Sequence, residues 1–196
     1  LSEIGQIAGR AGRYLNDGSF GITGECKEIT AEDVDLLESH KFEEIRTLFW
    51  RNSNLNFNNS SSLIKSLDEK PHMEWLRKIH ECEDEKALKY FLKDTNFNNL
   101  KFDEKTLSLL WECCQIPDFV KKTYGNHYEV IGSVFKFLSS DKRVISNDYM
   151  RLQLLKLDKL DGNVDSLSNR IANVRTWSYV SNKNNWVENQ NYWIEK

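Results

Sequence analysis

The chain has 196 residues, of which 39% are hydrophobic and 29% are charged, a composition typical of one soluble domain or of a domain with part of another. The net charge of −3 excludes a protein that binds nucleic acid through an overall positive charge, and no apolar run approaches the length that spans a membrane, so we expect no membrane partner. The chain contains only two prolines and nine glycines, which favours a mostly helical fold over a sheet-rich one.

Residues 1–28 have the pattern of a helix, a turn and one short strand. We predict a helix from Leu1 to Arg13 with Ser2 as its N-cap, and a turn at Asn16-Asp17-Gly18. The strand is predicted from Phe20 to Gly24. A lone strand is not stable, so its partners are expected in a part outside this sequence, or to be absent.

From residue 29 the pattern is helical. Thr30 and Asp33 form a capping box with a shorter acid, which opens a helix that runs to about Ser39. Ser146 can cap another helix further on. Between these two, helices are predicted over residues 42–50, 63–67, 84–93, 105–115 and 127–138, with a loop over residues 52–62.

The clearest periodicity is a row of apolar residues at alternating steps of three and four, which is a heptad pattern. Gly162 interrupts this row and either kinks one helix or joins two. The row spans too few heptads for an autonomous coiled coil, so packing in the core is favoured over dimerisation. Its members are Leu157, Leu160, Val164, Leu167, Ile171 and Val174.

Cysteine and histidine give no sign of a metal site. The four cysteines form no CxxC pair and the histidines have no ligand spacing, so zinc is not expected. We interpret all four cysteines as buried thiols in a reducing compartment. The C-terminal aromatic residues could stack on bases, but packing in the core is favoured. They are Trp177, Tyr179, Trp186, Tyr192 and Trp193.

The motif that carries chemistry is Gln6-Ile-Ala-Gly9-Arg10-Ala-Gly12-Arg13. On a helix, one amide and two guanidinium groups would share a face, because Arg10 follows Gln6 by four residues and precedes Arg13 by three. A glycine before each arginine leaves room for a close approach, and such a face suits a polyphosphate. The alternative is two surface arginines with incidental glycines, although glycine costs about 1 kcal/mol relative to alanine inside a helix.

This motif resembles motif VI of superfamily 2 helicases, QxxGRxGR, in the form found in DExH-type RNA helicases. Three later blocks look like the C-terminal region of the mitochondrial degradosome RNA helicase and its alphaproteobacterial relatives; they cover residues 48–53, 110–119 and 174–180. The resemblance implies that residues 1–28 end the second RecA-like α/β domain and that residues 29–196 form a helical C-terminal region. It also implies a bacterial cytoplasmic or mitochondrial matrix protein.

The resemblance assigns roles to the residues of the motif. Arg13 and Arg10 would be arginine fingers on the γ-phosphate. Gln6 would contact the nucleotide or couple it to the other motifs, and Gly9 and Gly12 would permit close packing across the cleft. The cofactor would be ATP with Mg²⁺. No GxxxxGK motif followed by Ser or Thr and no DExH sequence occurs in these 196 residues, so this chain is not expected to hydrolyse ATP alone.

The implied partners are single-stranded or duplex RNA and an exoribonuclease. Residues 142–183 contain eight basic and four acidic side chains, whereas residues 25–48 contain three basic and eight acidic ones. The basic stretch could therefore line an RNA path, or it could be an ordinary solvated helix face. Its candidates are Lys156, Lys159, Arg170 and Arg175. A rival interpretation of the whole chain is a non-catalytic helical adaptor that binds another protein.

Overall fold

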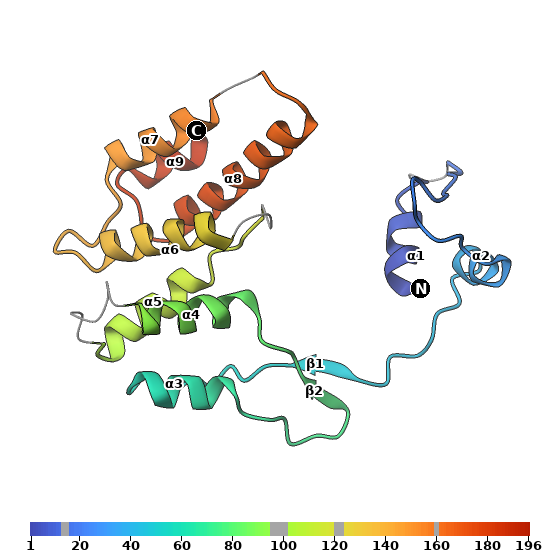
Figure 1. The fold of residues 1–196 in the computed structure, drawn as a ribbon, viewed down its shortest axis with the longest axis horizontal. Coiled ribbons are helices and arrows are strands. Elements are labelled where there is room, and N and C mark those ends of the chain that lie inside the picture. Colours follow the sequence, from blue (N-terminus) through green and yellow to red (C-terminus); the bar gives the residue numbers. More distant parts are fainter. Residues whose placement is uncertain (13–15, 95–101, 120–123, 159–160) are drawn as a thin grey trace. The chain divides into compact units, whose positions relative to one another are not determined.

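The computed structural model describes residues 1–12, 16–94, 102–119, 124–158 and 161–196 (Figure 1). It contains 53% helix and 5% strand, which confirms the mostly helical fold with a small remnant of sheet. The chain divides into two compact units: Leu1–Leu48, here called the N-terminal unit, and Phe49–Lys196, here called the helical unit. The predicted domain boundary after residue 28 stays a prediction, because it concerns the extent of a RecA-like domain.

The N-terminal unit contains helices α1 (Ser2–Ala8) and α2 (Ala31–Glu38). The N-cap of α1 is Leu1 rather than Ser2, and α1 ends before Gly9, so the predicted helix was too long. The capping box of α2 is confirmed. The Thr30 hydroxyl accepts a hydrogen bond from the Asp33 backbone N–H at 3.1 Å and donates one to the Asp33 carboxylate at 2.8 Å.

Two predictions in this part of the chain were wrong. Residues 20–24 form no strand, because an extended segment needs a neighbouring strand to pair with and these described residues have none. Residues 42–50 form no helix; residues 41–47 are irregular and β1 (Leu48–Trp50) follows. Ile45 and Phe49 are exposed and pack on no surface, and apolar spacing alone does not stabilise a short helix.

The helical unit begins with a β–α–β arrangement. Strand β1 pairs in parallel with β2 (Leu76–Lys78), and α3 (Ser60–Leu67) lies between them in sequence. The Asn59 side chain caps α3 by accepting a hydrogen bond from the Ser62 N–H at 2.8 Å, so α3 starts three residues earlier than predicted. Strand β2 was not predicted, because three residues are too few to show an alternating pattern.

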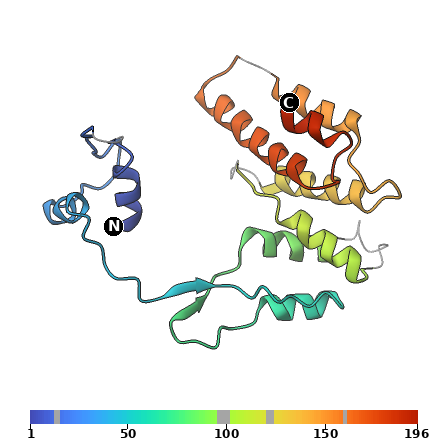
Figure 2. The ribbon, with the colours of Figure 1, turned by 180° about the vertical axis from the view of Figure 1, so that it is seen from behind.

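The remaining helices are stacked in layers. Both views show α4 and α5 next to α3, then α6, and then α7 with α8 and α9 (Figures 1 and 2). Ser146 caps α7 as predicted, accepting from the Tyr149 N–H at 3.3 Å. The bounds are α4 (Glu83–Lys93), α5 (Glu104–Cys114), α6 (Tyr124–Leu138), α7 (Asn147–Leu157), α8 (Val164–Asn182) and α9 (Gln190–Glu195).

The C-terminal aromatic residues belong mainly to the core, as expected. Trp177, Trp186 and Trp193 are buried, whereas Tyr192 is exposed. The indole N–H of Trp193 donates to the Asn147 side-chain oxygen at 2.8 Å, which fixes α9 against the start of α7. These tryptophans are therefore not available to stack on bases.

The apolar row with heptad spacing is divided between α7 and α8. The prediction that it packs in the core was wrong for its members on α8. Gly162 lies between α7 and α8 with φ = 150°, a backbone conformation that favours glycine, so it joins two helices. Leu160 lies outside the described residues. The side chains of the row on α8 are exposed, because α8 packs through another face; these side chains are Val164, Leu167, Ile171 and Val174.

A buried charge cluster joins β1 to the helices. The Arg51 guanidinium donates to the Asp84 carboxylate at 2.8 Å, and its Nε lies 3.7 Å from Glu85 Oε1. The guanidinium carbon also lies 4.9 Å from the centre of the Trp111 ring, a cation–π distance. Glu85 is only 2% exposed, and burial raises the pKa of its carboxyl group while the charge of Arg51 opposes that rise.

We predict that Arg51→Met lowers the free energy of unfolding by about 3 kcal/mol, because it leaves Glu85 buried without its cation. Lys86→Met is the matched control. It removes the Lys86–Glu83 ion pair at 2.8 Å, in which both side chains are exposed, and should cost less than about 1 kcal/mol. Urea unfolding of both variants measures the difference.

The same pair of variants gives a test by pH. Without Arg51, the pKa of Glu85 in the folded protein rises further above its unfolded value. A group with a raised folded pKa contributes stability as pH falls through that pKa, so the deficit of Arg51→Met should shrink between about pH 8 and about pH 5. Equal deficits for the two variants, or a deficit that grows on acidification, would contradict this account.

Candidate nucleotide-phosphate site

The candidate site is built on the end of α1. Gln6 lies inside this helix, and the helical turn continues past Ala8 through two backbone hydrogen bonds. The Arg10 N–H donates to Ile7 O at 3.1 Å and the Ala11 N–H donates to Ala8 O at 3.0 Å. Gly9 has helical backbone angles, φ = −64° and ψ = −8°. Gln6 and Arg10 are thus one helical turn apart, as the motif requires.

Gln6 and Arg10 are both exposed, and Arg10 has no ion-pair partner among the residues that the structure describes. An exposed guanidinium with its donors unused can bind a planar or tetrahedral anion. Arg13, the second predicted arginine finger, lies outside the described residues. Two of the three predicted donors are therefore placed on one helical turn, and the position of the third stays a prediction.

Gly12 of the motif and Gly18 after it allow a close approach of the backbone, a local role that was not predicted. A Cβ on Gly12 would lie 2.7 Å from Asn16 O, and a Cβ on Gly18 would lie 2.2 Å from the carbonyl carbon of Ala11. The chain therefore passes close to its own backbone just after α1, and only glycine allows this approach. Gly9 is less restricted, because its Cβ would meet only Gly5 O at 3.1 Å.

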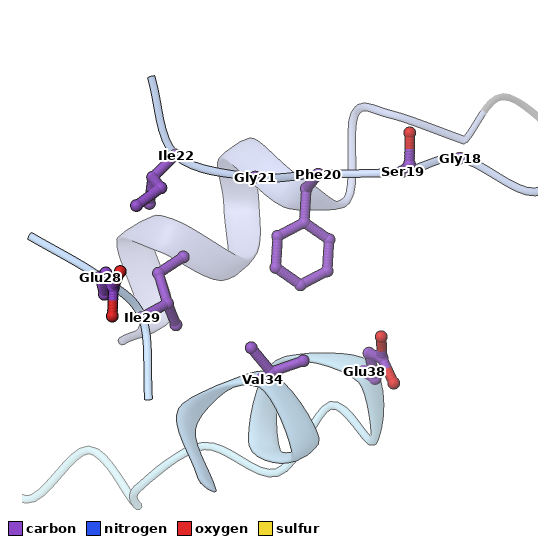
Figure 3. Close-up of a pocket in the computed structure, with 9 residues that line it drawn as sticks. All are labelled: Gly18, Ser19, Phe20, Gly21, Ile22, Glu28, Ile29, Val34 and Glu38. Carbon is purple, nitrogen blue, oxygen red and sulfur yellow. The ribbon is translucent and has the colours of Figure 1, made fainter. Parts of the chain in front are cut away.

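A cavity of about 480 Å³ lies beside the motif in the N-terminal unit. Figure 3 shows Phe20, Ile29 and Val34 pointing into it, with Glu28 and Glu38 at its edge. The two carboxylates at the edge of this cavity repel a phosphate, so the phosphate face of the motif is not this cavity. Sequence patterns give no sign of the cavity, because its residues come from an irregular segment and from α2.

The basic candidates for RNA that the structure describes differ in exposure. Lys156 is exposed on α7, Arg170 is half-buried on α8, and Lys159 lies outside the described residues. Arg175 is exposed, and its guanidinium carbon lies 4.1 Å from the centre of the Phe119 ring. Arg170 and Arg175 are five residues apart, so their side chains leave α8 in different directions. An RNA path along α8 would use one of them, not both.

The cysteines differ more than predicted. Cys113 and Cys114 are buried, and burial raises the pKa of both thiols, which makes them unreactive. Cys26 is exposed and Cys82 is half-buried, so the prediction of four buried thiols was wrong for these two.

The described residues contain no group of three side chains able to hold a metal ion. No described helix is both long and apolar enough to cross a membrane.

Comparison with known proteins adds no assignment. No protein-family model matches the chain, and no curated protein or solved structure is significantly similar to it. The motif and the positions of its described residues are therefore the basis for a proposed function.

We predict that Gly18→Ala opens the turn after α1. The added methyl group would overlap the backbone at Ala11 and Gly12, and overpacking of this kind costs about 1–3 kcal/mol. Hydrogen exchange of the Arg10 and Ala11 amides should become about tenfold faster. Gly21→Ala is the control, because its Cβ would meet nothing within 4 Å. The same exchange rates in both variants would show that the close approach does not hold this turn.

Proposed function

We propose that this chain is the C-terminal region of a superfamily 2 ATP-dependent RNA helicase and that its motif VI contacts the γ-phosphate of ATP. The observation that supports this most is the placement of Gln6 and an exposed Arg10 one helical turn apart within the sequence Gln-x-x-Gly-Arg-x-Gly-Arg, with no ion pair to Arg10 from any described residue. Planar guanidinium groups fit phosphate oxygens in pairs, and they stabilise the charge that develops when a phosphoryl group transfers.

In this proposal each residue of the motif has a separate task. Arg13 and Arg10 neutralise charge on the transferring γ-phosphate, and Gln6 orients the nucleotide or the attacking water. Gly9 and Gly12 let the arginine-bearing turn approach the opposite wall of the cleft. The chain offers donors to phosphate, but its 196 residues contain neither a Walker lysine motif nor a DExH sequence. ATP with Mg²⁺ would therefore be held jointly with a motor domain outside these 196 residues, and turnover requires both parts.

The helical unit would guide RNA that leaves the motor. Support comes from the excess of basic residues between 142 and 183, which can contact phosphates without reading the sequence of the RNA. Lys156 and either Arg170 or Arg175 are the candidates among the residues that the structure describes. An exoribonuclease that degrades the unwound strand is the partner that this activity would supply.

A second candidate function is a helical adaptor without catalysis. The exposed apolar row on α8 favours it, because such rows mark contacts with other proteins. The two functions differ in what the arginines do. An adaptor does not need an unpaired arginine on a glycine-bordered turn, whereas a phosphoryl-transfer site does.

We predict that Arg13→Ala in the intact protein abolishes RNA-stimulated ATP hydrolysis while RNA affinity changes little. An arginine finger contributes about 10³–10⁵ in rate in phosphoryl-transfer enzymes. RNA is held by many separate phosphate contacts, so one distant arginine hardly alters its affinity. Arg10→Ala should act in the same direction. Arg13→Lys should rescue poorly, because an ammonium group lacks the planar fork.

The measurement pairs the ATPase rate at saturating RNA with RNA affinity at fixed salt, on one preparation. Arg46→Ala is the control, since it removes an exposed arginine of the same unit outside the motif and should leave both quantities unchanged. A tenfold loss of RNA affinity with an unchanged ATPase rate would place the motif at the RNA and contradict the proposal.

A further inference from the structure

Helix α8 carries a row of exposed apolar side chains along its N-terminal half, here called the α8 row. Its members are Val164, Leu167, Ile171 and Val174, with exposed fractions of 78%, 40%, 63% and 46%. Single exposed apolar residues are common on protein surfaces, but four at helical spacing form a continuous strip. Exposure of such a strip to water is unfavourable, and another surface that covers it lowers the free energy.

The α8 row does not pack in the core of the helical unit. Helix α8 packs on that core through a different face, which includes Trp177 and Val180, and the Thr176 hydroxyl donates to Pro117 O at 3.2 Å. With 3.6 residues per turn, the α8 row points away from this buried face. The row is therefore directed outward, where the surface that covers it must come from elsewhere.

The two ends of the α8 row have complementary shapes. Val164 is the most exposed member and stands at one end, just after the joint between α7 and α8. At the other end Val174 lines a cavity of about 440 Å³. The apolar part of this cavity also comes from Leu155 and Leu157 on α7 and from Trp193 on α9. Ten residues of helix, about 15 Å, separate Val164 from Val174, which lines the cavity.

The charges at the two ends are also complementary. Asp161 and Asp165 lie beside Val164, on exposed positions. Among the described residues, the cavity at the Val174 end is lined by the bases Arg151 and Lys196 and by the acid Asp158. Opposite charges at the two ends favour contacts between unlike ends and oppose contacts between like ends.

We propose that a second copy of this chain covers the α8 row, with the two α8 helices antiparallel about a two-fold axis near Asn169. The row is symmetric about that position, so Val164 of one copy faces Val174 of the other, and Leu167 faces Ile171. Each projecting Val164 then enters the cavity of the other copy, and Asp161 lies near Arg151. A two-fold axis produces every one of these contacts twice.

Antiparallel pairing is favoured over the other arrangements that the α8 row could make. A parallel pair would bring the acidic ends together and leave both cavities unfilled. The row alone is shorter than the three to four heptads that sustain a coiled coil, so the cavity supplies a necessary part of the interface. This inference does not depend on the proposed helicase function, because no residue of motif VI takes part in it.

The test is sedimentation of the 196-residue chain over a range of about 1–100 μM, in which a dimer with a micromolar dissociation constant dissociates measurably. Ile171→Asp should weaken dimerisation about tenfold or more, because it places a charge in the centre of the apolar contact. Met73→Asp is the matched control, an exposed apolar residue outside the row that should leave dimerisation unchanged. Circular dichroism checks that both variants keep their helices.

Disulfide formation tests the direction of the pair. In a chain carrying Cys26→Ser, which removes the exposed thiol, Leu167→Cys and Ile171→Cys are prepared separately and oxidised alone or mixed. The antiparallel pair predicts crosslinks mainly between the two variants. A chain that stays monomeric throughout, equal dimerisation of Ile171→Asp and the unaltered chain, or crosslinks of each variant only with itself would each overturn the proposal.

Discussion

Arg51 connects the start of the helical unit to its core, and the arrangement of the first helices depends on this connection. Its guanidinium reaches Asp84 and Glu85 at the start of α4 and stacks on Trp111 in α5, so one side chain fixes β1 to two helices. Burial raises the pKa of the Glu85 carboxyl group, and the charge of Arg51 opposes that rise. The parallel pairing of β1 with β2 is too short to be stable by itself and relies on the same anchor.

Sequence patterns predicted the features that depend on neighbouring residues. The caps at Thr30 and Ser146 and the joint at Gly162 follow from local chemistry, and the structure has all three. The errors concern features decided by distant residues. Phe49 has the spacing of a helix but lies in a strand, because β2 is its partner. The α8 row has the spacing of a core helix but is exposed, because Trp177 and Val180 direct α8 inward by another face.

The candidate site was predictable only in part for the same reason. The spacing of Gln6 and Arg10 gives their placement on one turn, because a helical turn is local. The sequence did not predict that Gly12 and Gly18 are needed for a close approach of the backbone after α1. The pairing of Arg51 with Glu85 likewise joins residues far apart in sequence, and no spacing rule identifies such a pair.

The proposed helicase activity and the proposed dimer use different parts of the chain, so they can fail separately. The central claim is that motif VI works with a motor domain encoded in the same gene. Sequencing the transcript upstream of the codon for Leu1 tests this claim most directly. We expect an open reading frame that contains a Walker lysine motif followed by a DExH sequence. An initiation codon at or just before Leu1, with no such motifs in frame, would contradict it.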